Sequence, residues 1–276
     1  MATLTVIMAV YIKDNPDYFA KALRSIWDDQ ILKPSEIILI HDGPLTEAHY
    51  QIIETFRKHV GTILKEIVNT TNMGLTKSLN KGIEMATGDY IARMDSDDIA
   101  LPDRFILQVE YMSCHPEVMV LGGGMLEIDE NEIIGSRRLY PCSIDRIKHY
   151  IPKANPIPHP TVLFNAELFK KGFRYDEKFR KNQDLKLWFD LIKEGVIMEN
   201  LPDIILKFRR TEDTYTKRAS KISRKSEYEI YDSGIRDMYG RWSVKRVYPL
   251  VRYAVKSMPP WAAKTAYKYL FRKSGK

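Results

Sequence analysis

Residues 88–98, GDYIARMDSDD, join a strand-like apolar run to an acidic turn. Three carboxylates fall within the last four residues, directly after the run at residues 90–94. Acidic side chains gathered where a buried strand ends repel one another and lose hydration, so they need a cation or several hydrogen-bond donors. Oxygen ligands suit Mg²⁺ or Mn²⁺, and Mg²⁺ is usually held by one or two carboxylates together with substrate phosphates. The stretch by itself indicates either a divalent-cation site or an Asp-rich turn that caps the next helix, in whose first turn Pro102 and Asp103 would lie.

Upstream of this stretch, short apolar runs alternate with helical patterns, which is typical of βαβ units around a parallel sheet. We expect strands at residues 4–11, 36–41 and 63–68, a helix that opens at Pro16 with Asn15 as its cap, and helices at residues 47–59 and 75–85. The turn sequence at residues 42–44 follows the second strand. Open α/β sheets bind ligands at the carboxyl ends of their strands, so this turn is a candidate ligand contact.

Downstream the pattern is looser. We expect strands at residues 118–121, 125–128 and 161–164, a turn-rich stretch at residues 129–138, and an extended loop through the proline-rich residues 155–160. A helix should follow residues 182–184 and end at Gly195. Asp184 then lies at a helix start, where an N-cap role is the structural alternative to a catalytic one.

Composition is that of an ordinary globular protein, with 44% hydrophobic and 29% charged residues among 276. No apolar run approaches the roughly 18 residues of a membrane-spanning helix, and the first ten residues suggest a core strand rather than a signal peptide. Cys114 and Cys142 show no CxxC spacing, which argues against a disulfide framework and a zinc site. We therefore expect a protein of the reducing cytoplasm.

The C-terminal tail carries the surplus of positive charge. Ten of the 43 Lys and Arg residues, but none of the 36 Asp and Glu residues, lie after residue 240. An apolar helical stripe runs beside basic residues and comprises Val247, Leu250, Val251, Ala254, Val255 and Met258. A second segment, after Pro259 and Pro260, mixes aromatic and basic residues from Trp261 to Lys273. This pattern favours an anionic membrane surface, and the alternatives are a helix packed on the main domain or a basic arm for nucleic acid.

Taken in order, several motifs resemble family 2 glycosyltransferases of the GT-A fold, the inverting, nucleotide-sugar-dependent class of bacterial capsule, exopolysaccharide and O-antigen pathways. The resemblance spans residues 4–208. It rests on VIMAVY at residues 6–11, EIILIHDG at 36–43, NMGL at 72–75, NKGI at 80–83, GDYIARMDSDD at 88–98, LPDRF at 101–105, HPT at 159–161 and QDLKLW at 183–188. It implies an α/β GT-A domain, a Rossmann-like and mostly parallel mixed sheet flanked by helices, at residues 1–215. A basic, amphipathic, helical extension follows at residues 216–276.

The resemblance also implies a nucleotide site at the carboxyl ends of the first strands. Ala9, Tyr11 and Asp42 match positions that hold the uracil of a UDP-sugar; a carboxylate can accept the uracil N3 proton and an aromatic ring can stack on the base. The other implied nucleotide contacts are Gly74, Arg93 and Asp95. Arg93 could pair with phosphate or form a structural ion pair with Asp95.

The same motifs imply a metal site and a catalytic base. Asp97 matches the metal-ligating acid, assisted by Asp95, so the implied cofactor is Mn²⁺ or Mg²⁺, which would stabilise the departing nucleoside diphosphate. Asp184 matches the catalytic base, and we expect its position at a helix N-terminus to lower its pKa. Gln183 and His159 are candidate contacts to the donor or acceptor sugar.

The chain also departs from the family pattern. Many relatives carry Asp where this chain has His41, and a metal- or diphosphate-binding His after the last sheet strand, where residues 207–215 read KFRRTEDTY. Metal dependence could be weaker, or Arg209 and Arg210 could hold the phosphates. The QxxRW pattern of processive synthases is missing, so we expect one sugar per encounter.

We therefore expect a metal-dependent transferase that moves a hexose or N-acetylhexosamine from a UDP-sugar to a polyprenyl-diphosphate-linked or other oligosaccharide acceptor. It should be peripheral at the inner face of the plasma membrane, attached through the tail, with no nucleic-acid partner. One alternative is a sugar-phosphate nucleotidyltransferase, although residues 11–15, YIKDN, are not the Gly-rich loop that it needs. Another is a non-catalytic membrane adaptor on a degenerate transferase domain.

Overall fold

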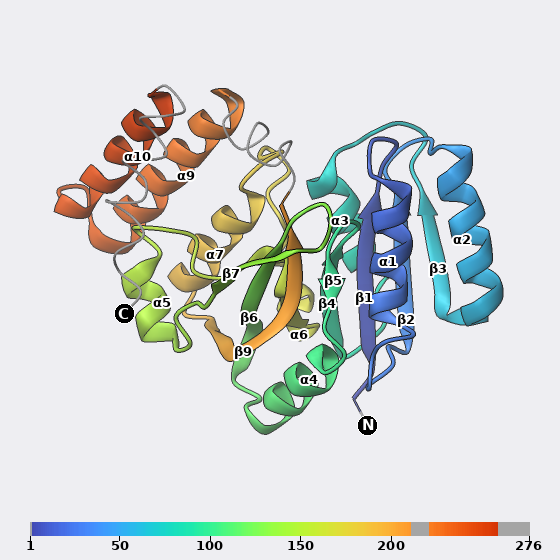
Figure 1. Cartoon of the computed structure of the whole chain (residues 1–276). Helices are drawn as coiled ribbons and strands as arrows, with labels where there is room; N and C mark the ends of the chain where they lie inside the picture. Colours follow the sequence, from blue (N-terminus) through green and yellow to red (C-terminus); the bar gives the residue numbers. More distant parts are fainter. Residues whose placement is uncertain (1, 211–220, 259–276) are drawn as a thin grey trace.

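The computed structural model describes residues 2–210 and 221–258 (Figure 1). Within this part of the chain, one mixed sheet of nine strands has the order β3-β2-β1-β4-β8-β6-β9-β5, with β7 paired to β6. The strands are β1 (Leu4–Val10), β2 (Glu36–His41), β3 (Leu64–Val68), β4 (Tyr90–Asp95), β5 (Ile99–Ala100), β6 (Val118–Ile128), β7 (Ile134–Arg138), β8 (Leu163–Asn165) and β9 (Ile197–Arg209).

Helices cover both faces of this sheet. The α-helices are α1 (Pro16–Ile26), α2 (Glu47–Val60), α3 (Leu75–Met85), α4 (Arg104–Cys114), α5 (Ile144–Tyr150), α6 (Glu167–Lys170), α7 (Gln183–Lys193), α9 (Lys221–Tyr239) and α10 (Val247–Ser257). Three short 3₁₀ helices are η1 (Gly61–Ile63), η2 (His159–Thr161) and η3 (Val244–Arg246).

The N-terminal half is the expected parallel βαβ arrangement. Strands β3, β2, β1 and β4 lie side by side and parallel. In β1, the side chains of Leu4, Val6, Met8 and Val10 pack with α1, α2 and α4, whereas Ile7 packs on the opposite face with α3 and α7. Burial on both faces explains why β1 and β2 read as nearly continuous apolar runs rather than as alternating patterns. The predicted GT-A architecture is confirmed.

Two local predictions in the second half were wrong. The strands expected at residues 118–121 and 125–128 are one strand, β6, whose pairing with β9 shifts register at Gly122 and Gly124. A Cβ on Gly122 would lie 2.2 Å from the Asn200 side-chain oxygen, so the glycine marks a close approach and not a chain break. The expected turn-rich stretch contains β7, which sequence patterning misses because its residues are largely exposed.

The two C-terminal helices extend the fold at the end away from α2 (Figure 1). Helix α9 packs on α7 and buries Ile230, Tyr231 and Ile235 in the core on that face of the sheet. Helix α10 in turn packs on α9. None of the described helices is long and apolar enough to cross a membrane. The predicted domain boundary at residues 215/216 and the aromatic, basic segment after Pro260 lie outside the described residues.

Candidate active site

Strand register brings the predicted nucleotide and metal residues to one edge of the sheet. Across β1 and β4, Ala9 is paired with Asp95, and across β1 and β2, Val10 is paired with His41, directly before Asp42. The carboxyl ends of β1, β2 and β4 therefore meet where Ala9, Asp42 and Asp95 lie. This is the edge at which open α/β sheets bind ligands.

The acidic turn after β4 forms a compact cluster of oxygen donors. Asp95, Asp97 and Asp98 each offer a carboxylate oxygen, and these oxygens lie within 4.8 Å of one another. Burial, reinforced by the negative charges of Asp95 and Asp14, raises the pKa of Asp97 to about 7, and burial also raises the pKa of Asp98. One oxygen of Asp98, Oδ2, is buried and has no hydrogen-bond partner among the described residues.

These observations fit a hard divalent cation, because a cation would relieve the mutual repulsion and supply the missing partner. The capping alternative is wrong. Strand β5 separates the acidic turn from α4, which begins at Arg104, and the Asp103 side chain makes no capping hydrogen bond.

Asp14 is a further acidic residue of this region that the sequence reasoning missed. Its carboxylate accepts hydrogen bonds from the Ser96 hydroxyl at 2.7 Å and from the Tyr11 backbone N–H at 3.1 Å. The loop after β1 is thereby tied to the acidic turn, with Tyr11 half-buried between them. Asp14 and Ser96 are far apart in the sequence, so only the fold reveals this pair.

Arg209 locks the acidic turn to neighbouring elements. Its backbone N–H donates to Asp98 Oδ1 at 2.8 Å and its Nε donates to the Asp97 carbonyl at 2.9 Å. The guanidinium also pairs with Glu132 at 3.2 Å and lies 4.0 Å from the centre of the Tyr18 ring. The side chain is fully buried by these contacts.

The suggestion that Arg209 and Arg210 hold phosphates is therefore not supported. Arg209 is committed to the acidic turn itself, and Arg210 pairs with Glu127 at 2.8 Å. Residues 211–215, the rest of the segment that lacks the expected His, lie outside the described part of the chain.

Asp42 shapes the loop that leads into α3. Its Oδ1 accepts the Met73 N–H at 2.7 Å and its Oδ2 accepts the Gly74 N–H at 3.0 Å. Gly74 has φ +86°, a left-handed conformation that favours glycine, and is the residue before α3. Asp42 is buried at this loop. Its assignment to uracil stays a prediction. It requires the carboxylate to accept a hydrogen bond from the base as well as from the two backbone amides.

Asp184 lies in the first turn of α7 and not at its N-cap. The N-cap is Asn182, which has φ +59° and makes no capping hydrogen bond through its side chain. The Asp184 carboxylate accepts a hydrogen bond from Asn155 Nδ2 at 2.6 Å, and the residue as a whole is half-buried. Asn155 is thus a second residue that sequence reasoning missed, because it was seen only as part of a proline-rich loop.

The electrostatic expectation for Asp184 was wrong in direction. Burial raises its pKa and outweighs the hydrogen bonds from the Leu185 N–H and Asn155 as well as the charge of Arg93, which all lower it. The helix N-terminus therefore does not dominate. A carboxylate with a raised pKa is a stronger base once ionised, which suits proton abstraction near neutral pH.

Arg93 interacts with both the acidic cluster and Asp184. It is 2% exposed, its Nη2 pairs with Asp95, and its positive charge lowers the pKa of Asp184 and of Asp97. Its Nε and Nη1 have no hydrogen-bond partner among the described residues. The predicted ion pair with Asp95 is confirmed. A contact of Arg93 with phosphate stays a prediction.

His159 and Gln183 are both buried next to this region. His159 Nε2 is 2.8 Å from the Tyr175 hydroxyl, and its ring packs edge-on against Tyr175 and Trp188. Burial, with the charge of Arg93, holds the pKa of His159 well below its usual range, so the ring is neutral. Gln183 is 5% exposed at the start of α7. Their assignment to a sugar stays a prediction.

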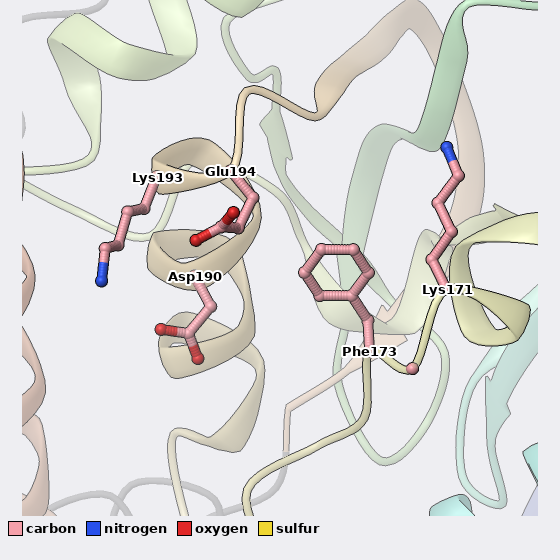
Figure 2. A pocket seen from close by; sticks show the side chains of 6 residues that line it. Lys171, Phe173, Asp190, Lys193 and Glu194 are labelled. Atoms are coloured by element: carbon pink, nitrogen blue, oxygen red, sulfur yellow. The ribbon is translucent and has the colours of Figure 1, made fainter.

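A separate cavity of about 370 Å³ lies at the opposite end of α7 from Asp184. In Figure 2, Asp190, Lys193 and Glu194 extend from the end of the helix, and Phe173 faces them from the loop after α6. This cavity is formed by surface side chains away from the ends of β1, β2 and β4. None of its lining residues is a predicted nucleotide, metal or base residue.

Comparison with known proteins agrees with this geometry. Residues 5–173 match the family model of Glycosyl transferase family 2. The amylovoran biosynthesis glycosyltransferase AmsE of Erwinia amylovora is 33% identical, over 82% of this chain and 84% of the relative. An uncharacterized glycosyltransferase of Haemophilus influenzae is 30% identical over 98% of this chain and 99% of its own length. A UDP-Gal:alpha-D-GlcNAc-diphosphoundecaprenol beta-1,3-galactosyltransferase of Escherichia coli is 29% identical, over 82% of each chain.

Solved structures share the fold at low sequence identity. S. aureus TarS in complex with UDP-GlcNAc has a TM-score of 0.68 at 16% identity, covering 99% of this chain and 74% of that one. The mannosyltransferase PcManGT from Pyrobaculum calidifontis, in complex with GDP-Man and Mn²⁺, has a TM-score of 0.66 at 15% identity, covering 96% of this chain and 73% of that one. These two structures show the fold alone, whereas the family match over residues 5–173 and the 33% identical relative show that the chain belongs to glycosyl transferase family 2.

Proposed function

We propose that the chain is an inverting, non-processive, metal-dependent glycosyltransferase of surface polysaccharide biosynthesis. It moves one hexose or N-acetylhexosamine from a UDP-sugar to a polyprenyl-diphosphate-linked oligosaccharide. One observation carries the proposal: a three-carboxylate cluster, whose Asp95 pairs with Arg93, and a separate carboxylate, Asp184, both interact with the positive charge of Arg93. The first suits a cation and a diphosphate, and the second suits an acceptor hydroxyl.

The nucleotide is proposed to bind along the ends of β1 and β2. Ala9 and Tyr11 would contact the base, with Asp42 and Gly74 forming the loop beside it. Asp95 and Asp97 would hold Mn²⁺ or Mg²⁺, which when bound offsets the negative charge that develops on the leaving diphosphate. Arg93 is proposed to contact the same phosphates, which requires donor binding to uncover its buried Nε and Nη1.

Asp184 is proposed to take the proton from the acceptor hydroxyl as that oxygen attacks the anomeric carbon from the side opposite the diphosphate. Such a single displacement inverts the anomeric centre and forms no covalent sugar–enzyme intermediate. Asn155 would hold the carboxylate in place through its 2.6 Å hydrogen bond. Asp184 belongs to α7, a helix with a well-buried apolar face, so the base sits on a rigid element.

The donor and acceptor classes take support from relatives. The E. coli relative is named for transfer from UDP-Gal to a diphosphoundecaprenol-linked sugar, and the TarS complex contains UDP-GlcNAc. A lipid-linked acceptor requires work at a membrane, which agrees with the basic tail, and we place the enzyme peripherally at the inner face of the plasma membrane. Family membership argues against the nucleotidyltransferase alternative, and the intact acidic cluster with Asp184 argues against a degenerate adaptor.

Thermal unfolding with UDP and Mn²⁺ tests the donor half of the proposal. Ligand that binds the folded state raises its stability by mass action, by about 2.7 kcal/mol at one hundred times the Kd. UDP with Mn²⁺ should raise the Tm of the wild-type chain, and Asp97→Ala should abolish the increase. Asp145→Ala is the matched control, because it removes an exposed carboxylate from α5. No response of the wild type to UDP at any metal concentration would refute the proposal.

A further inference from the structure

Helix α10 turns most of its apolar residues toward solvent. Four exposed residues form the surface here called the α10 stripe: Val247, Leu250 and Ala254 of α10 (Val247–Ser257), and Met258 directly after the helix; Val251 beside them is half-buried. The exposed fractions of Val247, Leu250 and Met258 are 56%, 55% and 44%. In a soluble protein an amphipathic helix ordinarily turns this face to the core, so the arrangement calls for another partner.

The opposite face of α10 holds the helix in this orientation. Arg252 is 6% exposed and pairs with Glu227 of α9 at 2.7 Å. Its guanidinium also lies 5.2 Å from the centre of the Tyr231 ring, and Val255 is buried beside it. Arg252 and Val255 thus pack inward, while Val247, Leu250 and Ala254 face out. A buried ion pair of this kind resists rotation of the helix, since turning it would leave a charge without its partner.

The apolar surface continues into the segment before α10. Trp242 and Val244 are 91% and 85% exposed, and Arg241 lies 5.7 Å from the Trp242 ring centre. Lys245 stands next to them in the chain, and residues 241–276 contain ten basic and no acidic residues. The surface therefore combines a protruding indole and an aliphatic stripe with the basic residues Arg241 and Lys245, whereas Arg246 is paired with Asp232 of α9.

We propose that the α10 stripe, with Trp242 and Val244, is the surface by which the enzyme docks on an anionic lipid bilayer. This inference rests on the proposed function and assigns its membrane contact to named residues. Trp is favoured at the boundary between headgroups and hydrocarbon, and basic residues beside an apolar helical face bind anionic lipids. A second copy of the chain is a poorer occupant, because two such surfaces would bring like charges together.

This docking surface is joined to the site of the proposed base. Arg252 Nη1 donates to the Lys153 carbonyl at 2.8 Å, and two residues later Asn155 donates to Asp184 at 2.6 Å. Helix α9, which carries α10, packs directly on α7, which carries Asp184. Helices α7, α9 and α10 lie side by side in Figure 1. Docking through the stripe would therefore hold the base in a fixed relation to the membrane from which a lipid-linked acceptor arrives.

Vesicle flotation of the full-length chain tests the proposal, with phosphatidylcholine vesicles compared with phosphatidylcholine–phosphatidylglycerol vesicles. The wild type should float with the anionic vesicles and remain unbound with the neutral ones. The double variant Trp242→Ser/Leu250→Ser should lose binding at least about tenfold, since each removed side chain loses the burial of a large apolar group. Ile133→Ser/Ile134→Ser is the matched control, because these residues are 65% and 64% exposed elsewhere on the molecule, and it should bind as the wild type does.

The outcomes separate this inference from the proposed function. Vesicle binding is measured without donor or acceptor, and the Trp242→Ser/Leu250→Ser variant should keep the UDP-dependent rise in Tm. Unchanged flotation of that variant would overturn the inference while leaving the transferase proposal intact. Wild-type flotation that is absent would overturn it as well. If light scattering shows that the wild type is a dimer and the Trp242→Ser/Leu250→Ser variant is a monomer, the surface binds a second copy of the chain instead.

Discussion

Asp184→Asn is the substitution that most sharply separates catalysis from binding in this chain. The asparagine keeps the size of the side chain, and its oxygen can still accept the 2.6 Å hydrogen bond from Asn155. What it loses is the ability to take a proton. Removing a general base costs about 10²- to 10⁴-fold in rate, so we expect kcat to fall about 10³-fold, equivalent to about 4 kcal/mol.

The structure also predicts what should not change. Asp184 lies on α7, and the proposed nucleotide residues lie at the ends of β1, β2 and β4, so the UDP- and Mn²⁺-dependent rise in Tm should match that of the wild type. Because burial raises the pKa of Asp184, wild-type turnover should fall as the pH drops through that raised pKa and the base becomes protonated. The variant should lack this acidic limb.

The assay is release of UDP from UDP-sugar in the presence of an acceptor, followed over a series of pH values. Asp190→Asn is the matched control, because it removes a carboxylate from the exposed end of the same helix, where Asp190 pairs with Lys186. Full turnover by Asp184→Asn would remove Asp184 from the role of base. Loss of turnover together with loss of the UDP response would mean that the substitution disturbs the fold or the donor site, and the assignment would fail.

Three further predictions concern stability and the acidic turn. Folding raises the pKa of Asp97 from 3.8 to about 7, so without a divalent cation the free energy of unfolding should decrease as the pH rises from about 4 to about 7. In Asp97→Asn, thermal unfolding at a series of pH values should show a smaller decrease. A pH dependence equal to that of the wild type would contradict the burial of Asp97. Arg209→Met should weaken UDP binding in the presence of Mn²⁺ at least about tenfold, measured by titrating the rise in Tm. The substitution removes the donor to the Asp97 carbonyl and the Arg209 partner of Glu132. A titration that matches the wild type would exclude this positioning role. Gly234→Ala should destabilise the chain by about 1 to 3 kcal/mol in urea, because its Cβ would lie 2.3 Å from the Phe189 ring, and a neutral result would show that α9 does not pack closely on α7.

The elements that sequence predicted well are those whose signals are local. Helix α3 begins at Leu75 and ends at Met85 as expected, and the Asn15 side chain caps α1 by accepting the N–H groups of Asp17 and Tyr18. The acidic cluster was also visible, since its carboxylates are nearly contiguous. Apolar periodicity and turn chemistry act within a few residues, so a single sequence contains them.

The features that sequence missed depend on distant partners. Asn155 meets Asp184 and Asp14 meets Ser96 only because the sheet and helices bring these residues together. Arg209 was considered for phosphate, yet the fold places its donors on Asp97 and Glu132. A basic residue has the same local signal whether it meets a ligand or the protein, and only the surrounding fold decides between these partners.

The orientation of α10 is a further case of this kind. Its apolar periodicity was plain in the sequence, but periodicity does not say which face meets the protein. The ion pair of Arg252 with Glu227, on a helix 25 residues earlier, sets that choice. Of the stripe that would ordinarily predict a core face, Val247, Leu250, Ala254 and Met258 are therefore exposed, and Val255 is buried.

The central claim is that the acidic turn binds a divalent cation together with a nucleoside diphosphate. Crystals grown with UDP and Mn²⁺ and measured at the manganese absorption edge test it directly. The account predicts one anomalous peak within ligand distance of Asp97, about 2.1 to 2.2 Å from an oxygen of the carboxylate and in contact with the diphosphate. A bound UDP with no peak at the acidic turn, or a peak at another site alone, would contradict it.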